Sequence, residues 1–597
     1  MFHKSMKSFL AFVLILACAA AGFAAEAPKS DDLYGWTPTR GARMTRNPFT
    51  TRYPAHGRYM VIGDNQYSAA AGFKILDRGG NAFDAAVAMA SVMGITYPKM
   101  NDLFGGDAMI LVYSVKDKKV IAYNGTGWAP KKATIDAYIE AGGIPDHGIL
   151  SVEIPGSFSG WMTLLQDYGT MKLSDILEPA VDLAENGYFL TQTMGPSEAD
   201  WKNFNDEAKS VYGTPDGARL KYGDRVKNPH YAQLLREVGK LSYKDAEDYV
   251  YRGPVAREIA EFSKAMGGLI EYEDLADFKA EKVEPHSTNF HGIDVYVCPP
   301  NSQGWVLLEA LNLIESYDLK AMGYNSAAYI DLLTQALNLA LQDRNHFVAD
   351  PRFHKNPMAL ISKKYAEERR KDMHLGKAMD GDIPVGSPTD TAKFGDVTYG
   401  TQGDTTFMAV ADAEGNIVAC TTSLCTAYGS HLMVPGRGFF LNSRMSYFFL
   451  DKDLANFLEP RKRTIQTITP SISLKDGRPF YVFGTPGADV QEQAKIQIFL
   501  NYAVWGMDPQ AAVEAPRFQS RHPMSVMYHV QYPRTIQVEG RVPEAVRKEL
   551  ADKYGYIVQT AGEWEYIGLM GAIGFDYKNG FLLGGSDPRA DGTAYGW

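Results

Sequence analysis

Two adjacent threonines follow an aspartate at the start of an apolar run, in GDTTFMAVADAEGN from Gly403 to Asn416. A threonine hydroxyl is a weak nucleophile unless a base lies next to it, and an N-terminal threonine carries such a base in its own α-amine. The α-amino pKa of about 8 is close enough to neutrality for this role. Attack of the Thr405 hydroxyl on the Asp404 carbonyl would break the bond and create that N-terminus. The residues alone also fit a simpler interpretation, in which two β-branched residues begin a strand.

Other catalytic or metal-binding patterns are scarce. The 12 histidines form no HExxH motif or close pair and the cysteines form no CxxC motif, so we expect no metal site. GxSxG elbows and Walker loops do not occur. The glycine-bearing segments LFGGD and FGTPG are more typical of tight turns than of phosphate cradles. We therefore expect no cofactor.

The elements around these threonines alternate between strands and helices. TTFMAVAD and IVACTTSL, joined by the turn AEGN, predict a hairpin that begins at Thr405, and SISL and PFYVFG predict further strands. NDLFGGDAMILVYSVKDKKVIAYNG predicts another hairpin, and IDVYVCPP a strand before a helix over 305–317. Helices are also predicted on both sides of Gly79-Gly80-Asn81, through most of 154–282, and at VQEQAKIQIFLNYAV and EAVRKELADKYG. This order indicates a layered arrangement of helices and sheets.

Composition limits the class of protein. The 597 residues are 45% hydrophobic, enough for a large core, and the formal net charge of −10 gives no attraction for nucleic acid, which we do not expect as a partner. Residues 379–403 are rich in Gly, Asp, Thr and Pro and predict an exposed loop that ends at the threonine pair. Cys298, Cys420 and Cys425 are too few for a disulfide framework and predict small buried residues.

Residues 1–25 have the layout of a cleaved secretory signal. Two lysines precede an apolar stretch, which is followed by small residues up to Ala25. The run Phe9 to Ala25 is shorter than the ~20 apolar residues that span a bilayer, and no membrane span is expected after it. A periplasmic or secreted location follows. As an alternative, the segment before Cys18 also resembles a lipoprotein box, which would anchor the chain through lipid on that cysteine.

An ordered series of motifs identifies a family. The chain resembles the γ-glutamyltransferase family, which includes glutathione hydrolases and belongs to the N-terminal-nucleophile hydrolases. Each motif alone is weak, but the set in this order is specific. The motifs are LDRGGNAFDAAVAMA, FGGDAMILVY, VEIPGSFSGW, LEPAVDLAENGY, VCPPNSQG, QDRNHFVADPRF, GDTTFMAVADAEGN, YGSHLMVPGRGFFLN, FGTPGAD, VEAPRF and GGSDPRADG.

The resemblance implies a precursor that cuts itself between Asp404 and Thr405. The products would be a large subunit, 26–404, and a small subunit, 405–597, which stay associated. The implied fold is of the α/β (α+β) class, a four-layer αββα sandwich formed by both subunits, with the catalytic threonine at the start of a central strand.

The resemblance also implies further site residues. A second hydroxyl near the nucleophile falls on Ser423. Two backbone N–H groups that stabilise the oxyanion fall on Gly487 and Ala488, where the side chain matters little because the donors belong to the backbone. Two serines of the family's substrate site correspond to Gln466 and Thr467.

The positions that contact the glutamyl group depart from the family. Loss of a bidentate arginine contact to the α-carboxylate should weaken glutamyl recognition strongly. Arg437, Arg444 or Arg463 could supply a replacement, but the sequence does not place them. The changed positions are Thr126 for that arginine, Ser446 and Tyr447 in the segment of the acid that holds the α-amine, Gln466 and Thr467 for the two serines, and Cys425 for an asparagine.

Three functions remain open. The first is a self-processing γ-glutamyltransferase-like enzyme that cleaves a small-molecule amide through an acyl-enzyme on Thr405. The second is an amidohydrolase or acylase of the same fold that acts on a non-glutamyl amide, as relatives do on oxamate and cephalosporin side chains. The third is a non-catalytic exported binding protein, against which the intact Asp404-Thr405 bond and Gly487 argue.

Overall fold

The computed structural model describes residues 51–388 and 404–597, apart from Tyr528. The signal over 1–25, the lipid-bearing Cys18 and the loop residues 389–403 lie outside the described residues.

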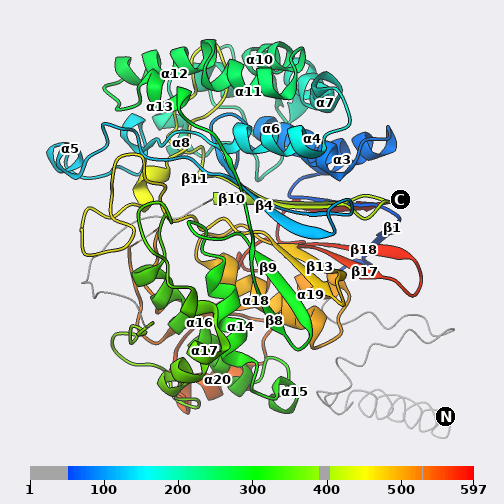
Figure 1. Cartoon of the computed structure of the whole chain (residues 1–597), viewed down its shortest axis with the longest axis vertical. Helices are drawn as coiled ribbons and strands as arrows, with labels where there is room; N and C mark the ends of the chain where they lie inside the picture. Colours follow the sequence, from blue (N-terminus) through cyan, green and yellow to red (C-terminus); the bar gives the residue numbers. More distant parts are fainter. Residues whose placement is uncertain (1–50, 389–403, 528) are drawn as a thin grey trace, which may run out of the picture.

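Two seven-stranded sheets stack face to face (Figure 1). We call them the Thr405 sheet, in the order β19-β2-β10-β11-β3-β4-β7, and the second sheet, in the order β1-β18-β17-β13-β12-β9-β8. All strand pairs within both sheets are antiparallel. The Thr405 sheet consists of β2 (Met60–Gly63), β3 (Asp107–Ser114), β4 (Lys119–Gly125), β7 (Glu281–Val283), β10 (Asp404–Ala411), β11 (Ile417–Cys425) and β19 (Thr593–Gly596). The second sheet consists of β1 (Ala55–Gly57), β8 (His286–Phe290), β9 (Ile293–Val297), β12 (Ser471–Lys475), β13 (Arg478–Gly484), β17 (Gly571–Asp576) and β18 (Phe581–Ser586).

Residues of β10 alternate between two cores. Phe407 and Ala409 belong to the apolar cluster between the sheets, with residues of β12, β13 and β17. Met408 and Val410 belong to the cluster formed with the helices on the other side. This alternation follows from the two-residue period of a strand. Both faces of the Thr405 sheet are therefore buried.

Helices cover the outer face of each sheet and complete four layers (Figure 1). The predicted four-layer αββα sandwich is confirmed. On the outer side of the Thr405 sheet lie α3 (Gln66–Asp77), α4 (Ala82–Thr96), α6 (Ser157–Tyr168), α7 (Leu173–Asn186), α10 (Pro229–Gly239), α11 (Tyr243–Tyr251), α12 (Pro254–Ala265) and α13 (Tyr272–Ala276). On the other side lie α14 (Trp305–Ile314), α16 (Ala327–Phe347), α17 (Lys363–Arg369), α18 (Val490–Ala503), α19 (Pro509–Glu514) and α20 (Glu544–Asp552).

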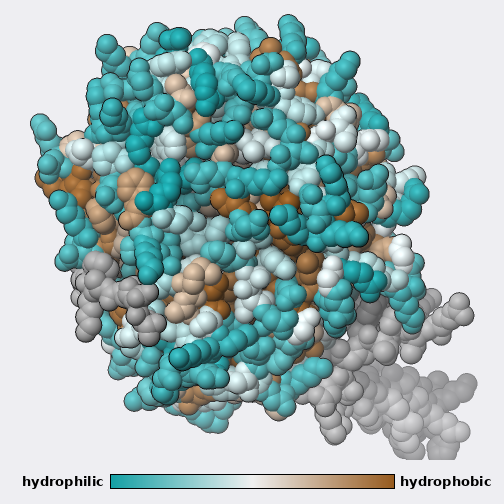
Figure 2. All heavy atoms as spheres, in the orientation of Figure 1, coloured by the Kyte–Doolittle hydropathy of each residue, from teal (hydrophilic) through white to brown (hydrophobic). Residues whose placement is uncertain are grey.

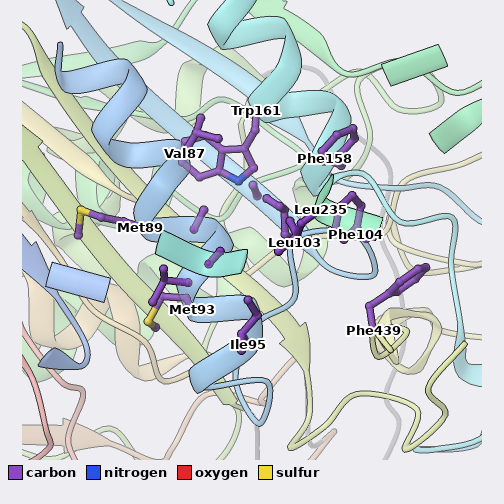
Figure 3. Close-up of a cluster of buried hydrophobic side chains, with 14 of the residues drawn as sticks. Val87, Met89, Met93, Ile95, Leu103, Phe104, Phe158, Trp161, Leu235 and Phe439 are labelled. Carbon is purple, nitrogen blue, oxygen red and sulfur yellow. The ribbon is translucent and has the colours of Figure 1, made fainter. Parts of the chain in front are cut away.

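Helix α4 forms the centre of the helical layer on the Thr405 sheet. Asn81 caps its N-terminus and forms a reciprocal capping box with Asp84, as the Gly79-Gly80-Asn81 junction predicts. Every residue of α4 is buried, which fits a helix that is apolar on all sides. Figure 3 shows Val87, Met89 and Met93 of this helix near Trp161 of α6 and the chain around Leu103.

Most predicted elements are present with small changes in length. The hairpins of β3 with β4 and of β10 with β11 form as predicted, whereas α14 ends at Ile314 rather than at residue 317. A small sheet of β14 (Phe518–Ser520), β15 (Thr535–Glu539) and β16 (Ile557–Ala561) was not predicted. Cys298, Cys420 and Cys425 are buried free thiols, which confirms the expectation for the cysteines.

The surface is mainly polar. Figure 2 shows hydrophilic residues over most of one face, with hydrophobic residues in small patches. No helix in the described part of the chain is both long enough and apolar enough to cross a membrane.

Candidate active site

Thr405 lies at the start of β10, beside the end of β11. Its Oγ1 donates a hydrogen bond to Ser423 Oγ at 3.1 Å, and both side chains are buried. The register of the two strands shifts between Asp404 and Thr406, and such an irregularity turns a side chain out of the regular ladder. The structure therefore brings together the two hydroxyl residues that the sequence singled out.

The second threonine of the pair has a different environment. Thr406 Oγ1 lies 2.8 Å from Thr422 Oγ1, its neighbour across the strand pair. Because successive residues of a strand face opposite sides, this hydroxyl is directed away from Ser423. The local geometry thus distinguishes Thr405 from Thr406 as the residue that faces the second hydroxyl.

Asp64 fixes the chain just after the threonine pair. Its Oδ2 accepts a hydrogen bond from the Phe407 N–H at 2.8 Å. This hydrogen bond lowers the pKa of the Asp64 carboxyl, but burial has the larger effect and raises that pKa to about 8. At neutral pH this carboxyl is therefore held largely in its uncharged form beneath the start of β10.

The predicted oxyanion donors lie in the turn between β13 and α18. Gly487 has a φ of 123° and Ala488 a φ of 50°, so both residues adopt the backbone region that favours glycine. Among the described residues, no acceptor is hydrogen-bonded to either N–H. Just before this turn, Gly484 packs closely on Phe407 of β10, because a Cβ on Gly484 would lie 2.2 Å from the Phe407 ring.

Gln303 links this turn to the predicted substrate-binding residues. Its Nε2 donates to the carbonyl oxygens of Thr467 at 3.1 Å and Ala488 at 3.2 Å, and its N–H donates to the Gln466 carbonyl at 2.8 Å. Its Oε1 accepts from the buried Arg344. One side chain therefore holds two segments of the predicted site at a fixed separation.

Gln466 and Thr467 contact two other segments of the chain, Gln466 the segment around Glu153 and Thr467 the turn at residues 444–447. Gln466 Nε2 lies 3.4 Å from Glu153 Oε1, and Thr467 Oγ1 lies 3.1 Å from the Tyr447 hydroxyl. All of these residues are buried. The structure thus places Thr467 and Tyr447, two of the positions at which the sequence departs from the family pattern, in direct contact.

The sequence reasoning missed two carboxyl groups in this region. Asp107 is the direct partner of Ser423 in the pairing of β3 with β11. Glu153 lies beside Asp107, and burial together with that neighbouring charge raises the pKa of Glu153 well above its usual value. Their signal was present in FGGDAMILVY and VEIPGSFSGW, each of which places an acid beside an apolar run.

The three arginines considered as replacements lie in different places. Arg437 is ion-paired with Glu237 at 2.6 Å and with Glu258 at 2.5 Å. Arg463 donates from Nε to the Thr126 carbonyl at 3.0 Å, and its Nη1 pairs with Glu281 at 3.0 Å. Arg444 Nε lies 3.3 Å from Asp107 Oδ2, next to the strand that carries Ser423.

A family model described as Gamma-glutamyltranspeptidase matches residues 68–597. The chain belongs to this family.

The similar proteins of this family include both hydrolases and acylases. The chain is 34% identical to the Glutathione hydrolase-like YwrD proenzyme of Bacillus subtilis, over 90% of this chain and 98% of that protein. It is 32% identical to the Acylase ACY 1 proenzyme of Pseudomonas sp. strain SE83, over 90% and 94%. The crystal structure of cephalosporin acylase from Bacillus halodurans has a TM-score of 0.81 at 30% identity and covers 92% of this chain and 97% of that one.

Membership of the gamma-glutamyltranspeptidase family makes the protein an enzyme of the N-terminal-nucleophile hydrolase type. The relatives are proenzymes, in keeping with a precursor that processes itself and with amide hydrolysis as the reaction. This result argues against the third function, a non-catalytic binding protein.

Asp64→Asn tests the buried carboxyl beneath β10. The pKa of Asp64 in the folded state, about 8, lies above the ordinary aspartate value. The stability that Asp64 contributes is therefore fully present below the ordinary aspartate pKa and is lost as the pH rises through 8. The asparagine cannot ionise, so the free energy of unfolding of the variant should rise relative to that of the wild type as the pH rises, by at most about 1.4 kcal/mol per pH unit. Urea unfolding between about pH 5 and pH 8 measures this difference. Parallel pH curves would contradict the assignment.

Proposed function

We propose that Thr405, released by cleavage of the Asp404-Thr405 bond, is the nucleophile that attacks the carbonyl carbon of a small-molecule amide. The large subunit, 26–404, and the small subunit, 405–597, stay associated, since β10 and β11 of the small subunit lie between β2 and β3 of the large one. The hydrogen bond between Thr405 and Ser423 is the observation that carries the proposal, because it holds the hydroxyl in one orientation at the end of a buried strand.

Self-cleavage uses the same hydroxyl as catalysis. Thr405 Oγ1 attacks the Asp404 carbonyl carbon, the C–N bond breaks, and the nitrogen leaves as the new α-amine. The resulting ester between Asp404 and Thr405 is hydrolysed by water, which releases the Asp404 carboxylate. The free α-amine is then in place as a general base.

Catalysis proceeds through an acyl-enzyme. The α-amine of Thr405 accepts the hydroxyl proton as Oγ1 adds to the substrate carbonyl, and the Gly487 and Ala488 N–H groups donate to the oxyanion that forms. The protonated α-amine gives its proton to the leaving amine as the substrate C–N bond breaks. Water or an acceptor amine then attacks the Thr405 ester, which releases the acyl group and restores the hydroxyl.

The acyl group of the substrate is either glutamyl-like or a non-glutamyl group. The relative from B. subtilis is described as glutathione hydrolase-like, which supports a γ-glutamyl amide such as glutathione. The relative from Pseudomonas is described as an acylase, which supports a non-glutamyl amide on the same nucleophile. The replacement of the family's arginine by Thr126 favours the second, because a threonine cannot form a bidentate contact to a carboxylate.

The layout of residues 1–25 supports export to the periplasm or the medium. Attachment through lipid on Cys18 is the alternative.

Thr405→Ala should abolish both processing and amide hydrolysis, because alanine lacks the attacking oxygen. The variant should remain a single chain close to the 66.0 kDa of the full sequence, less the signal, whereas the wild type should yield a fragment beginning TTFMAV. Intact mass and N-terminal sequencing measure this. Thr406→Ser is the matched control and should be cut normally, since it keeps the hydroxyl that faces Thr422. Normal cutting of Thr405→Ala would refute the assignment.

Ser423→Ala should slow turnover more than processing. Loss of a neutral hydrogen bond to the nucleophile predicts a fall in kcat of roughly 10-fold. Ser473→Ala is the control, because the hydroxyl of that buried strand serine donates to the Tyr481 carbonyl in the second sheet. Steady-state kinetics of the two processed variants provide the comparison, and equal kcat values for Ser423→Ala and the wild type would remove Ser423 from the site.

A further inference from the structure

Two histidine rings stack on each other where the two proposed subunits meet. His147 belongs to the proposed large subunit and His431 to the proposed small subunit, and their ring centroids lie 4.1 Å apart at an interplanar angle of 32°. His431 is buried and His147 is half-buried. Neither residue has a part in the proposed acyl transfer, so the pair needs a different explanation.

His147 is bonded to the turn that follows β11. Its Nδ1–H donates to the Gly429 carbonyl at 3.0 Å, since a carbonyl oxygen only accepts. The next residue adds a backbone bond, from the Gly148 N–H to the Ser430 carbonyl at 2.9 Å. In the neutral ring the lone pair is therefore on Nε2, and this is the atom that gains a proton in acid.

Asp200 holds the other ring. This residue lies in α8 (Glu198–Asn203), and its Oδ1 is 3.2 Å from His431 Nε2. Burial alone would raise the pKa of Asp200, but its hydrogen bonds to His431 and Ser197 hold that pKa below the usual value. His431 Nδ1 is buried and has no hydrogen-bond partner among the described residues. A proton added at Nδ1 would meet no acceptor there, and a buried donor left unbonded is costly.

The surroundings of His147 favour its neutral ring. Burial lowers the pKa of His147, and the neighbouring His431 adds to this effect. Two charged imidazoles with centroids 4.1 Å apart would also repel each other. The exposed Asp146 next to His147 also interacts with His529 of the proposed small subunit. The groups that oppose the lowered pKa of His147 are the Gly429 carbonyl, Asp146 and Asp200.

The turn that His147 contacts is continuous with the strand that carries Ser423. Thr426 begins this turn, directly after the last residue of β11. Its Oγ1 donates to the Gly429 carbonyl at 3.0 Å, so that one oxygen accepts from both Thr426 and His147. Loss of the His147 contact therefore loosens the end of β11, just beyond Ser423.

We propose that the stacked pair of His147 and His431, held by Asp200, is an acid-sensitive clasp between the large and the small subunit, closed at neutral pH and opened when His147 gains a proton. The proposal rests on the proposed function only in that cleavage before Thr405 makes the two sides separate subunits. The contacts themselves are present in the uncut chain.

The direction of the pH dependence follows from the lowered pKa of His147. The stability of the closed clasp is fully present above the ordinary histidine pKa of about 6.5 and is lost as the pH falls through the lower pKa of the closed state. With one proton taken up on opening, the equilibrium constant for opening rises by at most ~10-fold per pH unit.

Hydrogen exchange at pH 7 and pH 5 tests this proposal, measured by mass spectrometry on peptides that cover 144–151 and 426–432. The protection factor, which removes the intrinsic pH dependence of exchange, should fall roughly 10-fold over both segments in the wild type as the pH is lowered. Protection over 407–411 of β10 should not change.

His147→Asn should abolish this fall. Asparagine keeps a donor for the Gly429 carbonyl but cannot take up a proton, so protection over 144–151 and 426–432 should be the same at both pH values. His286→Asn is the matched control and should keep the wild-type fall. Burial lowers the pKa of His286 as well, but this histidine lies on β8 and accepts from Trp305 Nε1 at 2.7 Å.

Two outcomes would overturn the proposal, equal protection at both pH values in the wild type and a fall that persists in His147→Asn. If His147→Asn does not fold, as judged by near-ultraviolet circular dichroism at pH 7, His431→Gln decides in its place. Glutamine keeps a donor for Asp200 but removes the ring and its charge, so the fall should be smaller than in the wild type, and an equal fall would refute the clasp.

The same measurement on Thr405→Ala separates the clasp from the role of the nucleophile. The uncut variant should show the wild-type fall in protection, because the clasp does not need the cleavage. Normal cutting of Thr405→Ala together with that fall would refute the nucleophile and leave the clasp standing. An uncut Thr405→Ala chain with no fall in it or in the wild type would refute the clasp and leave the role of Thr405 standing.

Discussion

The antiparallel register of β10 with β11 is the constraint on which the site depends. Thr405 meets Ser423 because Ala409 pairs with Ala419 further along the same two strands. Residues on one face of this pair form the core between the sheets, and residues on the other face pack on the helices. A slip of one residue would exchange the two faces and place apolar side chains against the wrong core. The core therefore fixes the register, and the register fixes the position of Thr405 beside Ser423.

The second sheet supplies the other half of the site through close packing. Gly484 allows β13 to lie against the Phe407 ring, so the turn with Gly487 and Ala488 can approach the start of β10. Gln303 then ties this turn to Thr467. Neither contact involves the reacting groups themselves, yet both hold segments of the proposed site together. Preorganisation of this kind is how buried active sites stabilise developing charge without reorganising solvent.

The protein belongs to the gamma-glutamyltranspeptidase family but departs from the family pattern at the positions expected to contact the glutamyl group. Thr405 and Ser423 are hydrogen-bonded to each other at the start of β10, as the proposed acyl transfer needs. The surrounding positions now form a buried polar cluster of Asp107, Glu153 and Arg444. Such a cluster is expensive to bury unless its members bind one another or a ligand.

Much of the fold was predictable from the sequence, because periodicity, caps and turns are local properties. The strand pair from residue 404 to residue 425, the helix capped by Asn81 and the four-layer architecture all follow from pattern and motif order, and so did the proposal of Thr405 and Ser423. The joining of Asp107, Glu153 and Arg444 was not predictable, although the first two stand in quoted motifs and Arg444 was one of the three arginines considered. These three residues are separated by 46 to 337 positions in the chain, and only strand pairing and layer stacking decide that they meet. The sequence thus determined which residues could react, whereas the tertiary structure decided which charged side chain lies beside them, because that depends on contacts between segments that no local signal connects.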